Sequence, residues 1–290
     1  MKFDKNTKIL IVGLGLIGGS YAKALSDEGY FVGAIDKKKS SVEYALKNGL
    51  IQVGETSVKK DFVKDFDLIV FALYPHDFIN WIKEYQSSIK SGALITDVIG
   101  VKSFVVENVQ KILRGDLEFV GAHPMAGKEV SGVENADSKI FVGANYIVTP
   151  TKRNTDENVQ AVQDLGRALG FERISSLSPE EHDETVGFLS HLTHCIAVSL
   201  MVSKKSHHLA EYTGDSFRDL TRIAKINDEM WSELFLANKD ELLKQMDLFE
   251  EKFNQLKEDI KNDNREKIRE TLRESTARRK VFDKDAKETK

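Results

Sequence analysis

Residues 8–20 read KILIVGLGLIGGS. The first five residues form a short apolar run typical of a buried β-strand, and the residues after the glycines have a helical pattern. Glycine lets a backbone turn approach a pyrophosphate closely, and the phosphate charge then lies at the N-terminus of the following helix. We therefore predict a dinucleotide site. Its predicted residues are Gly13, Gly15, Leu16, Ile17 and Gly18.

An acidic residue ends the second predicted strand. Residues 30–36 read as a strand, which places Asp36 about 20 residues after the glycine turn, as in dinucleotide-binding βαβ units. A carboxylate there accepts hydrogen bonds from a ribose 2′-hydroxyl and repels a 2′-phosphate, so Asp36 favours NAD over NADP. The lysines at 37–39 weaken this preference because they could pair with a 2′-phosphate. The turn itself does not separate NAD from FAD.

Apolar strands alternate with helical segments through the first 175 residues. Strands are predicted at 8–12, 30–36, 67–72, 93–97, 118–122, 144–149 and 171–174, and helices at 19–28, 78–89 and 155–169. Continuous apolar strands of this kind indicate a parallel sheet covered by helices on both faces. We therefore predict an α/β fold in which residues 1–175 form a Rossmann-type domain with a doubly wound parallel sheet.

The strand pattern stops near Pro179, and residues 176–290 are predicted to form an all-helical domain for substrate binding and dimerisation. The run at 184–201 is apolar on most faces, as expected of a helix buried by other helices or by a second subunit. Apolar residues recur at helical spacing between 228 and 279, which predicts long amphipathic helices. We expect a homodimer formed through this domain.

Composition excludes several classes of function. The chain of 290 residues carries 42 basic and 46 acidic side chains, a net charge of −4, and no long basic block, so nucleic acid is not an expected partner. No apolar signal core is visible at the start, and no apolar run reaches the ~20 residues that span a bilayer. The single cysteine, Cys195, excludes an internal disulfide. We expect a soluble, cytoplasmic protein with no membrane partner.

A histidine follows the strand predicted at 118–122. Ligands of open parallel sheets bind beyond the carboxyl ends of the strands, and His123 is a side chain in that region that exchanges a proton near neutral pH. We predict His123 as an acid–base group beside the nicotinamide end of the cofactor. His182, His191 and His194 suggest a metal site, but no further ligand set accompanies them, so no metal is expected.

Four ordered motifs resemble those of the prephenate and arogenate dehydrogenases of tyrosine biosynthesis. The motifs are GLGLIGGS at 13–20, HPMAG at 123–127 with Glu129 and Gly132, His182-Asp183 with SHLTH at 190–194, and FRDLTRIA at 217–224 with Met230-Trp231. The likeness runs along nearly the whole chain. It implies a Rossmann domain, a helical dimerisation domain, and the oxidative decarboxylation of prephenate to 4-hydroxyphenylpyruvate with NAD.

The resemblance also implies roles for residues that contact the substrate. His123 resembles the base that holds the ring hydroxyl, and His194 resembles a histidine in contact with the substrate. Arg222 resembles the arginine that binds the ring carboxylate, to which a guanidinium can donate two hydrogen bonds. Trp231 resembles a tryptophan close to the substrate.

Two further positions agree with the family pattern, and one departs from it. Glu129 and Asp183 resemble acidic residues that gate the site. Gly100 departs from the family pattern, because many members have a serine there, near the substrate hydroxyl. His123 is therefore expected to act with a water molecule or with no partner.

Other functions stay open at this point. An arogenate dehydrogenase takes the amino analogue, and the residues do not separate a keto from an amino side chain. A β-hydroxyacid dehydrogenase would have a catalytic lysine on the first long helix of the second domain, whereas Lys204 and Lys205 lie near the end of that helix. An NAD-sensing protein without turnover would not need both His123 and Arg222.

Overall fold

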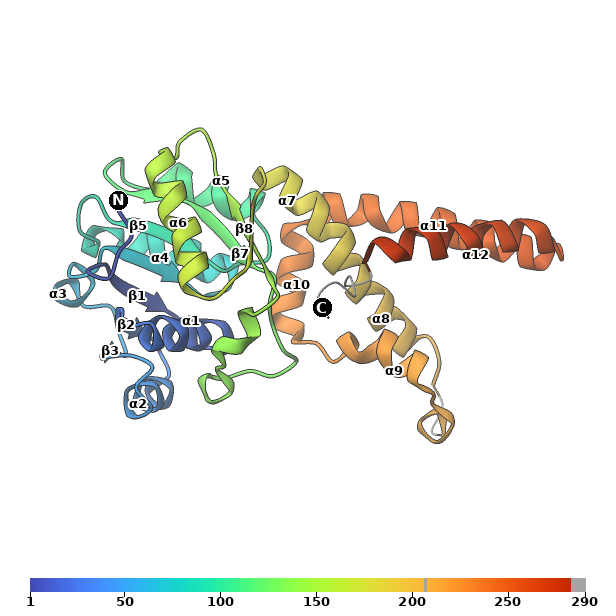
Figure 1. Cartoon of the computed structure of the whole chain (residues 1–290), viewed down its shortest axis with the longest axis horizontal. Helices are drawn as coiled ribbons and strands as arrows, with labels where there is room; N and C mark the ends of the chain where they lie inside the picture. The colour runs from blue at the N-terminus through green and yellow to red at the C-terminus, as the bar shows by residue number, and fades with distance from the viewer. Residues whose placement is uncertain (206–207, 283–290) are drawn as a thin grey trace, which may run out of the picture. The chain divides into compact units, whose positions relative to one another are not determined.

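The structure is a computed structural model that describes residues 1–205 and 208–282. Six parallel strands form a sheet in the order β3-β2-β1-β4-β5-β6 (Figure 1). The strands are β1 (Lys8–Val12), β2 (Phe31–Ile35), β3 (Val53–Glu55), β4 (Leu68–Phe71), β5 (Leu94–Asp97) and β6 (Glu118–Phe119). The strand order reverses between β1 and β4, which is where doubly wound sheets bind dinucleotides. The predicted α/β fold is confirmed.

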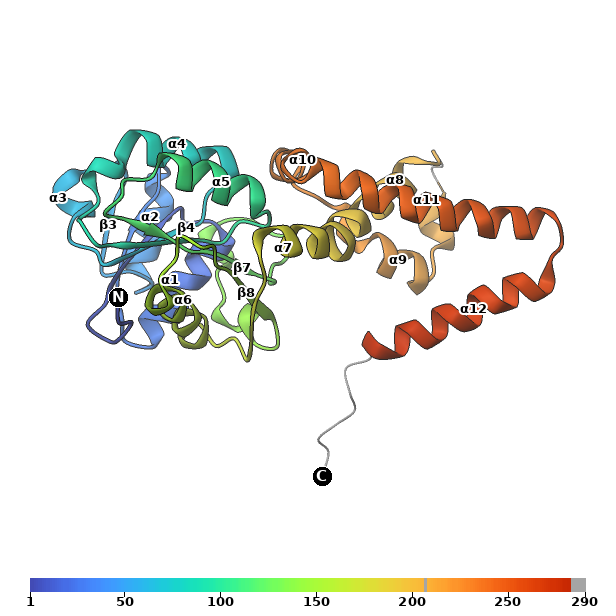
Figure 2. The same ribbon diagram turned by 90° about the horizontal axis from the view of Figure 1, so that it is seen from above.

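Helices cover both faces of this sheet (Figure 2). The first face carries α1 (Leu16–Asp27), α2 (Lys39–Lys47) and α6 (Asp156–Ala168), and the second carries α3 (Lys60–Val63), α4 (Pro75–Tyr85) and α5 (Ser103–Ile112). Successive side chains of a strand point to opposite faces. In β1, Ile9 and Ile11 accordingly pack with the first set of helices, whereas Leu10 and Val12 pack with the second. Burial on both faces explains the continuous apolar strands in the sequence.

A second sheet of three strands divides one of the predicted strands. Its order is β7 (Gly121–Pro124), β8 (Asn145–Thr149) and β9 (Arg173–Ser176), with β7 antiparallel to β8. The strand predicted at 118–122 therefore splits, because β6 pairs with β5 while β7 pairs with β8. Gly121 allows this close pairing, since a Cβ there would lie 2.5 Å from the Thr149 hydroxyl oxygen. The short strand β3 was not predicted.

A nearly continuous helical segment follows the strands. It consists of α7 (Pro179–Val186), a π-helical turn (Gly187–Leu192) and α8 (Thr193–Val202). Several of its apolar side chains are exposed, including Phe188 at 54% and Val202 at 73%. By length and composition alone the segment 179–202 could cross a membrane, a weak indication because core helices of soluble proteins have the same properties.

The described residues divide into two compact units, one that extends to Lys239 and one that begins at Asp240. The first unit also contains α9 (Asp215–Thr221), a 3₁₀ turn (Arg222–Ala224) and α10 (Asp228–Ala237). The second unit contains most of α11 (Lys239–Lys261) and α12 (Arg265–Arg279). The chain is helical, without strands, between Pro179 and Phe282 wherever the structure describes it. The boundary near residue 175 stays a prediction of domain organisation.

Candidate active site

The glycine turn joins β1 to α1 in a conformation that side chains would block. Gly13 has a φ of 98°, and a Cβ there would lie 2.4 Å from the Ala72 carbonyl oxygen. A Cβ on Gly18 would lie 1.9 Å from the Gly13 carbonyl oxygen, so both glycines are needed to close the turn. A Cβ on Gly15, by contrast, would meet nothing within 4 Å. This open side leaves room for a phosphate against the backbone.

The start of α1 supplies donors to that space. Leu16 and Ile17 are its first two residues, and the N–H groups of a first helical turn have no partner within the helix. Such groups, together with the positive end of the helix dipole, stabilise an anion. The residues present therefore fit the pyrophosphate of a dinucleotide.

Asp36 supports the turn from the end of β2. One of its carboxylate oxygens accepts a hydrogen bond from the Leu14 N–H at 2.6 Å, and the other accepts from the Lys38 N–H at 2.7 Å. An ionised carboxylate offers about four lone-pair positions, so Asp36 can also accept from a ribose hydroxyl. Of the three neighbouring lysines, Lys39 forms an exposed ion pair with Glu43 at 3.4 Å.

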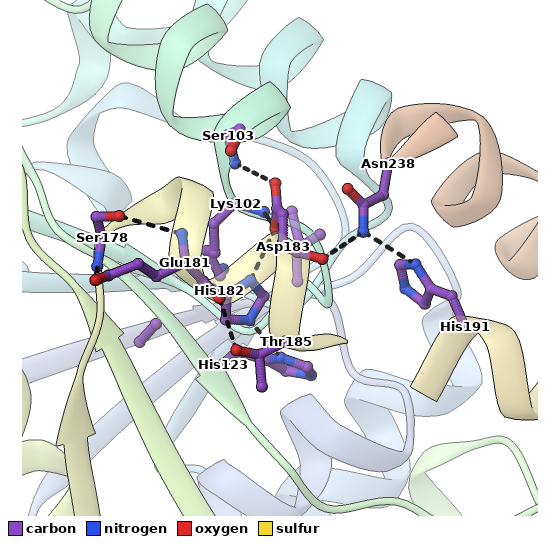
Figure 3. Close-up of polar contacts among 12 residues, drawn as sticks. Lys102, Ser103, His123, Ser178, Glu181, His182, Asp183, Thr185, His191 and Asn238 are labelled. Atoms are coloured by element: carbon purple, nitrogen blue, oxygen red, sulfur yellow. Dashed lines mark hydrogen bonds and ion pairs between the residues drawn. The ribbon is translucent and has the colours of Figure 1, made fainter. Parts of the chain in front are cut away.

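His123 lies on β7, with its two ring nitrogens in different surroundings. Its Nδ1 is 2.9 Å from Nε2 of His182 (Figure 3). Its Nε2 faces Gly100, where a Cβ would lie 3.6 Å from Nε2 and 3.8 Å from Cδ1 of Leu234 on α10. The missing side chain at Gly100 therefore leaves Nε2 uncovered on that side.

Helix α10 also brings Trp231 to the site. Trp231 lies one turn before Leu234 and stacks on the ring of His194, with centroids 3.7 Å apart and an interplanar angle of 30°. Nδ1 of His194 donates to the Ser190 carbonyl oxygen at 2.8 Å, which leaves Nε2 as the nitrogen that can contact a ligand. His194 lies near the start of α8, just after the π-helical turn. Turns of this kind are frequent at functional sites.

Glu129 and Arg222 form an ion pair beside His194. The pair joins the loop after β7 to the 3₁₀ turn after α9, and the Arg222 side chain is 65% exposed. Burial lowers the pKa of His194, while the charge of Glu129 opposes this shift and that of Arg222 adds to it. The three charged or titratable groups thus lie in one neighbourhood.

Asp183 lies below this surface in a buried network with Lys102 (Figure 3). Its carboxylate accepts hydrogen bonds from the Lys102 N–H at 2.7 Å, the Ser103 N–H at 2.8 Å and Nδ1 of His182 at 2.8 Å. The side chain is only 2% exposed and both oxygens are occupied. This placement differs from the gate that the resemblance implied, because a gating carboxylate has to reach the entrance of a site.

The surroundings of His123 keep its ring neutral. Burial is the main reason why the pKa of His123 lies well below its ordinary value, and electrostatic interactions with His182, Lys102 and His191 lower it further. A histidine with a lowered pKa has an unprotonated nitrogen at neutral pH and can accept a proton there. The structure thus places a neutral histidine beside Gly100, and it groups His194 with Trp231 and Arg222.

The sequence indicated His182 only as a possible metal ligand and as part of a family motif, and it assigned no role to Lys102 or Asp97. Nζ of Lys102 is 2.6 Å from a carboxylate oxygen of Asp97, with both side chains fully buried. The other oxygen of Asp97 accepts from the Ala122 N–H at 3.0 Å, next to His123. His182 stands in a quoted motif, but its partner is 59 positions away in the chain. Within the two described ranges, no three His, Cys, Asp or Glu side chains are grouped to hold a metal ion.

The doubly wound sheet and the glycine turn together are those of a dinucleotide-dependent dehydrogenase. Two family models match, described as "Prephenate dehydrogenase, nucleotide-binding domain" at residues 21–173 and "Prephenate dehydrogenase, dimerization domain" at residues 178–274. The chain belongs to the prephenate dehydrogenase family, and the predicted resemblance is confirmed.

Individual relatives show the same relationship. Prephenate dehydrogenase from Bacillus subtilis is 34% identical over 82% of this chain, which spans 66% of that relative. The crystal structure of prephenate dehydrogenase from A. aeolicus with hydroxyphenyl propionate and NAD+ has a TM-score of 0.87 and 34% identity, covering 96% of this chain and 98% of that one. The crystal structure of Synechocystis arogenate dehydrogenase has a TM-score of 0.81 and 25% identity. The match covers 95% of this chain and 100% of that one.

Proposed function

We propose that this chain catalyses the oxidative decarboxylation of prephenate to 4-hydroxyphenylpyruvate with NAD. The observation that carries the proposal is the uncovered Nε2 of His123, which faces Gly100 near the helix that carries Trp231. Dehydrogenation of an alcohol carbon needs a base for the hydroxyl proton, and a neutral histidine supplies one. Family membership supplies the substrate class.

The residues divide the reaction between them. His123 accepts the proton of the ring hydroxyl at Nε2 while the carbon–hydrogen bond of the same ring carbon breaks. When bound, NAD supplies the acceptor for the departing hydride. The ring carboxylate leaves as carbon dioxide, and its bonding electrons complete the aromatic ring. The former hydroxyl oxygen then takes back the proton from Nε2 of His123, which gives the phenol and restores the neutral histidine. Trp231 and His194 hold the ring in place by packing against it.

Arg222 is the proposed partner of the substrate carboxylate. Its guanidinium is exposed and forms an ion pair with the carboxylate of Glu129, which a substrate carboxylate would replace. Glu129 is thus proposed to hold Arg222 in position before the substrate arrives. Exchange of one carboxylate for another keeps the arginine paired throughout.

We assign NAD as the cofactor on the basis of Asp36. Its carboxylate is held beside the glycine turn by two backbone N–H groups, so a 2′-phosphate at this position would meet a fixed negative charge. Asp36→Ser should therefore raise the KM for NAD and lower the KM for NADP. Unchanged KM values for both cofactors would contradict the assignment.

A second candidate activity is that of an arogenate dehydrogenase. The similarity to the Synechocystis enzyme of that name favours it. Both substrates have the ring hydroxyl and ring carboxylate that His123 and Arg222 would bind, and they differ in the keto or amino group of the side chain. The same residues therefore serve either reaction.

Initial rates of NADH formation test these proposals. The purified protein should reduce NAD with prephenate, and parallel assays with arogenate and with NADP define the preferences. Turnover of arogenate alone would keep the chemistry and change the substrate. Absence of turnover with both substrates would contradict the proposed function and return the NAD-sensing alternative.

We also propose that the chain forms a homodimer through its helical segment at 179–202. The proposal is supported by the matched dimerisation family model and by the exposed apolar side chains of this segment. Light scattering at micromolar concentration should give twice the chain mass of 32.7 kDa. A mass of one chain would contradict it. The cytoplasmic location and the absence of nucleic-acid and membrane partners stay predictions.

A further inference from the structure

A row of three hydrogen-bonded side chains, two of them buried, ends at the proposed base. Asp183 contacts Nδ1 of His182 at 2.8 Å, and Nε2 of His182 contacts Nδ1 of His123 at 2.9 Å (Figure 3). His182 is fully buried, and its ring meets that of His123 edge-on, with centroids 5.1 Å apart. The contacts run from α7, which carries Asp183 and His182, to β7 of the second sheet, which carries His123.

The direction of these hydrogen bonds follows from Asp183, the residue at the far end of the row from His123. Asp183 accepts from two backbone N–H groups, those of Lys102 and Ser103, so its carboxylate acts as an acceptor. Burial opposes the charge of Asp183, but the contacts with His182 and the two N–H groups lower its pKa overall. An ionised Asp183 requires Nδ1 of His182 to be the donor.

The remaining protons are then determined. Burial lowers the pKa of His182, so its ring is neutral and carries one proton, the one on Nδ1. Its Nε2 is therefore an acceptor, and the 2.9 Å contact requires Nδ1 of His123 to carry the proton of that ring. Nε2 of His123 is left with a free lone pair on the side that faces Gly100.

We propose that Asp183 and His182 are positioning residues that fix His123 in the Nδ1–H tautomer, so that Nε2 is the atom that receives the substrate proton. This inference rests on the proposed dehydrogenase function for the identity of that proton. The two residues act through His123 and touch neither substrate nor cofactor. Without these two residues, the neutral ring of His123 could carry its proton on Nε2 instead. That nitrogen could then not accept the substrate proton.

The same row of side chains stabilises the charge that forms during the reaction. After His123 has accepted a proton at Nε2, its ring is positive and still donates from Nδ1 to His182. The carboxylate of Asp183, one ring further, faces this charge through the hydrogen-bonded imidazole. Charge formed in buried surroundings interacts more strongly with such a partner than it would in water.

Local structure holds His182 and Asp183 rigidly. The helix α7 begins with a capping box, in which Ser178 and Glu181 exchange hydrogen bonds of 2.8 and 3.1 Å. The amide of Asn238 donates to the Asp183 carbonyl oxygen at 2.9 Å. These contacts fix the first two turns of α7 on both sides, as a positioning role requires.

The tautomer of His123 can be measured directly in the folded protein. We expect long-range proton–nitrogen NMR spectra of ¹⁵N-histidine-labelled protein at neutral pH to show a protonated Nδ1 and an unprotonated Nε2 for His123. The His123 signals are assigned by their loss in His123→Asn. A proton on Nε2 of His123 in the unmodified protein would overturn the proposal.

Substitutions at His182 provide the kinetic test. The carbonyl of His182→Gln can accept from His123 while its amide donates to Asp183, whereas His182→Leu can do neither. We expect kcat to fall about 10²-fold or more for leucine, to remain within about tenfold of the unmodified enzyme for glutamine, and the KM for NAD to stay unchanged in both. The exposed Glu180→Gln on the same helix is the matched control and should keep full activity.

Asp183→Asn tests the role of Asp183, the residue farthest from the base in this hydrogen-bonded row. An asparagine amide that donates to Nδ1 of His182 would reverse both rings and move the proton of His123 to Nε2. Equal kcat values for the two His182 variants, or an unchanged His123 tautomer in a folded Asp183→Asn protein, would contradict the proposal. If the unmodified protein fails to oxidise prephenate, the proposed function is wrong, while the NMR measurement still decides the tautomer.

Discussion

Arg222 forms an ion pair with Glu129, although the two residues are 93 positions apart in the chain. The pair connects the loop after β7 to the turn after α9, and the two residues lie on opposite sides of His194 in the sequence. A carboxylate is thus already bound where the substrate carboxylate is proposed to bind. The contact shows that the arginine is accessible to an anion at this place.

Removal of the guanidinium should weaken substrate binding selectively. Arg222→Ala loses charge-assisted hydrogen bonds of about 1.5–3 kcal/mol, so the KM for prephenate should rise about 10- to 100-fold while the KM for NAD stays nearly unchanged. Steady-state kinetics with each substrate varied in turn measures this. Arg218→Ala, which removes an exposed arginine paired with Asp215, is the control and should have little effect. Equal rises in both KM values would contradict the assignment.

Replacement of the base should slow the chemical step. His123→Asn keeps a polar side chain but cannot accept the hydroxyl proton, so kcat should fall about 10²- to 10⁴-fold. NAD affinity, measured by fluorescence titration, should change little because His123 lies outside the glycine turn. An unchanged kcat would remove His123 from the role of base.

Two glycines of the cofactor turn should respond differently to alanine. Gly13→Ala forces a side chain into a positive φ and against the Ala72 carbonyl, which should destabilise the fold by about 1–3 kcal/mol or more. Gly15→Ala meets no protein atom within 4 Å, so the protein should fold normally and bind NAD more weakly. Urea denaturation and NAD titration separate these effects. Equal losses of stability would contradict the structural difference between the two positions.

The buried histidines should make stability depend on pH. Burial lowers the pKa values of His123 and His182, and that of His191 to about 4, whereas an unfolded histidine titrates near ~6.5. Below pH ~6.5 the unfolded state therefore binds more protons than the folded state, and folding stability decreases as the pH falls toward 4. Thermal melting followed by circular dichroism should show Tm falling over this interval. His191→Asn should reduce the dependence, and a Tm that rises on acidification would contradict it.

Local sequence patterns were sufficient for most of the parallel sheet. The apolar runs at 8–12, 67–72 and 93–97 correspond to β1, β4 and β5 within about one residue, because strands buried on both faces leave a continuous apolar signal. The three-residue strand β3 left no such signal. The division of 118–122 between two sheets depends on which neighbouring strand accepts each half, and this is not visible in the segment itself.

The candidate site was predictable in part. The motifs indicated His123, His194, Arg222 and Trp231, and the structure places His194 against Trp231. Asp183 was expected to gate the site, yet its oxygens are occupied by backbone N–H groups of Lys102 and Ser103, about 80 positions earlier in the chain. Its partners follow from how α7 docks on the start of α5, which no spacing within the motif specifies.

The sequence by itself determined the dinucleotide turn, the doubly wound sheet and the family, because each depends on residues that are neighbours in the chain or on ordered motifs. Only the tertiary structure decided which nitrogen of His123 is free. That property depends on an aspartate and a histidine of α7, which pack against the strand that carries His123, and on the absence of a side chain at Gly100. Hydrogen-bond direction passes between side chains through space, so it is set only after the helical segment packs against the second sheet.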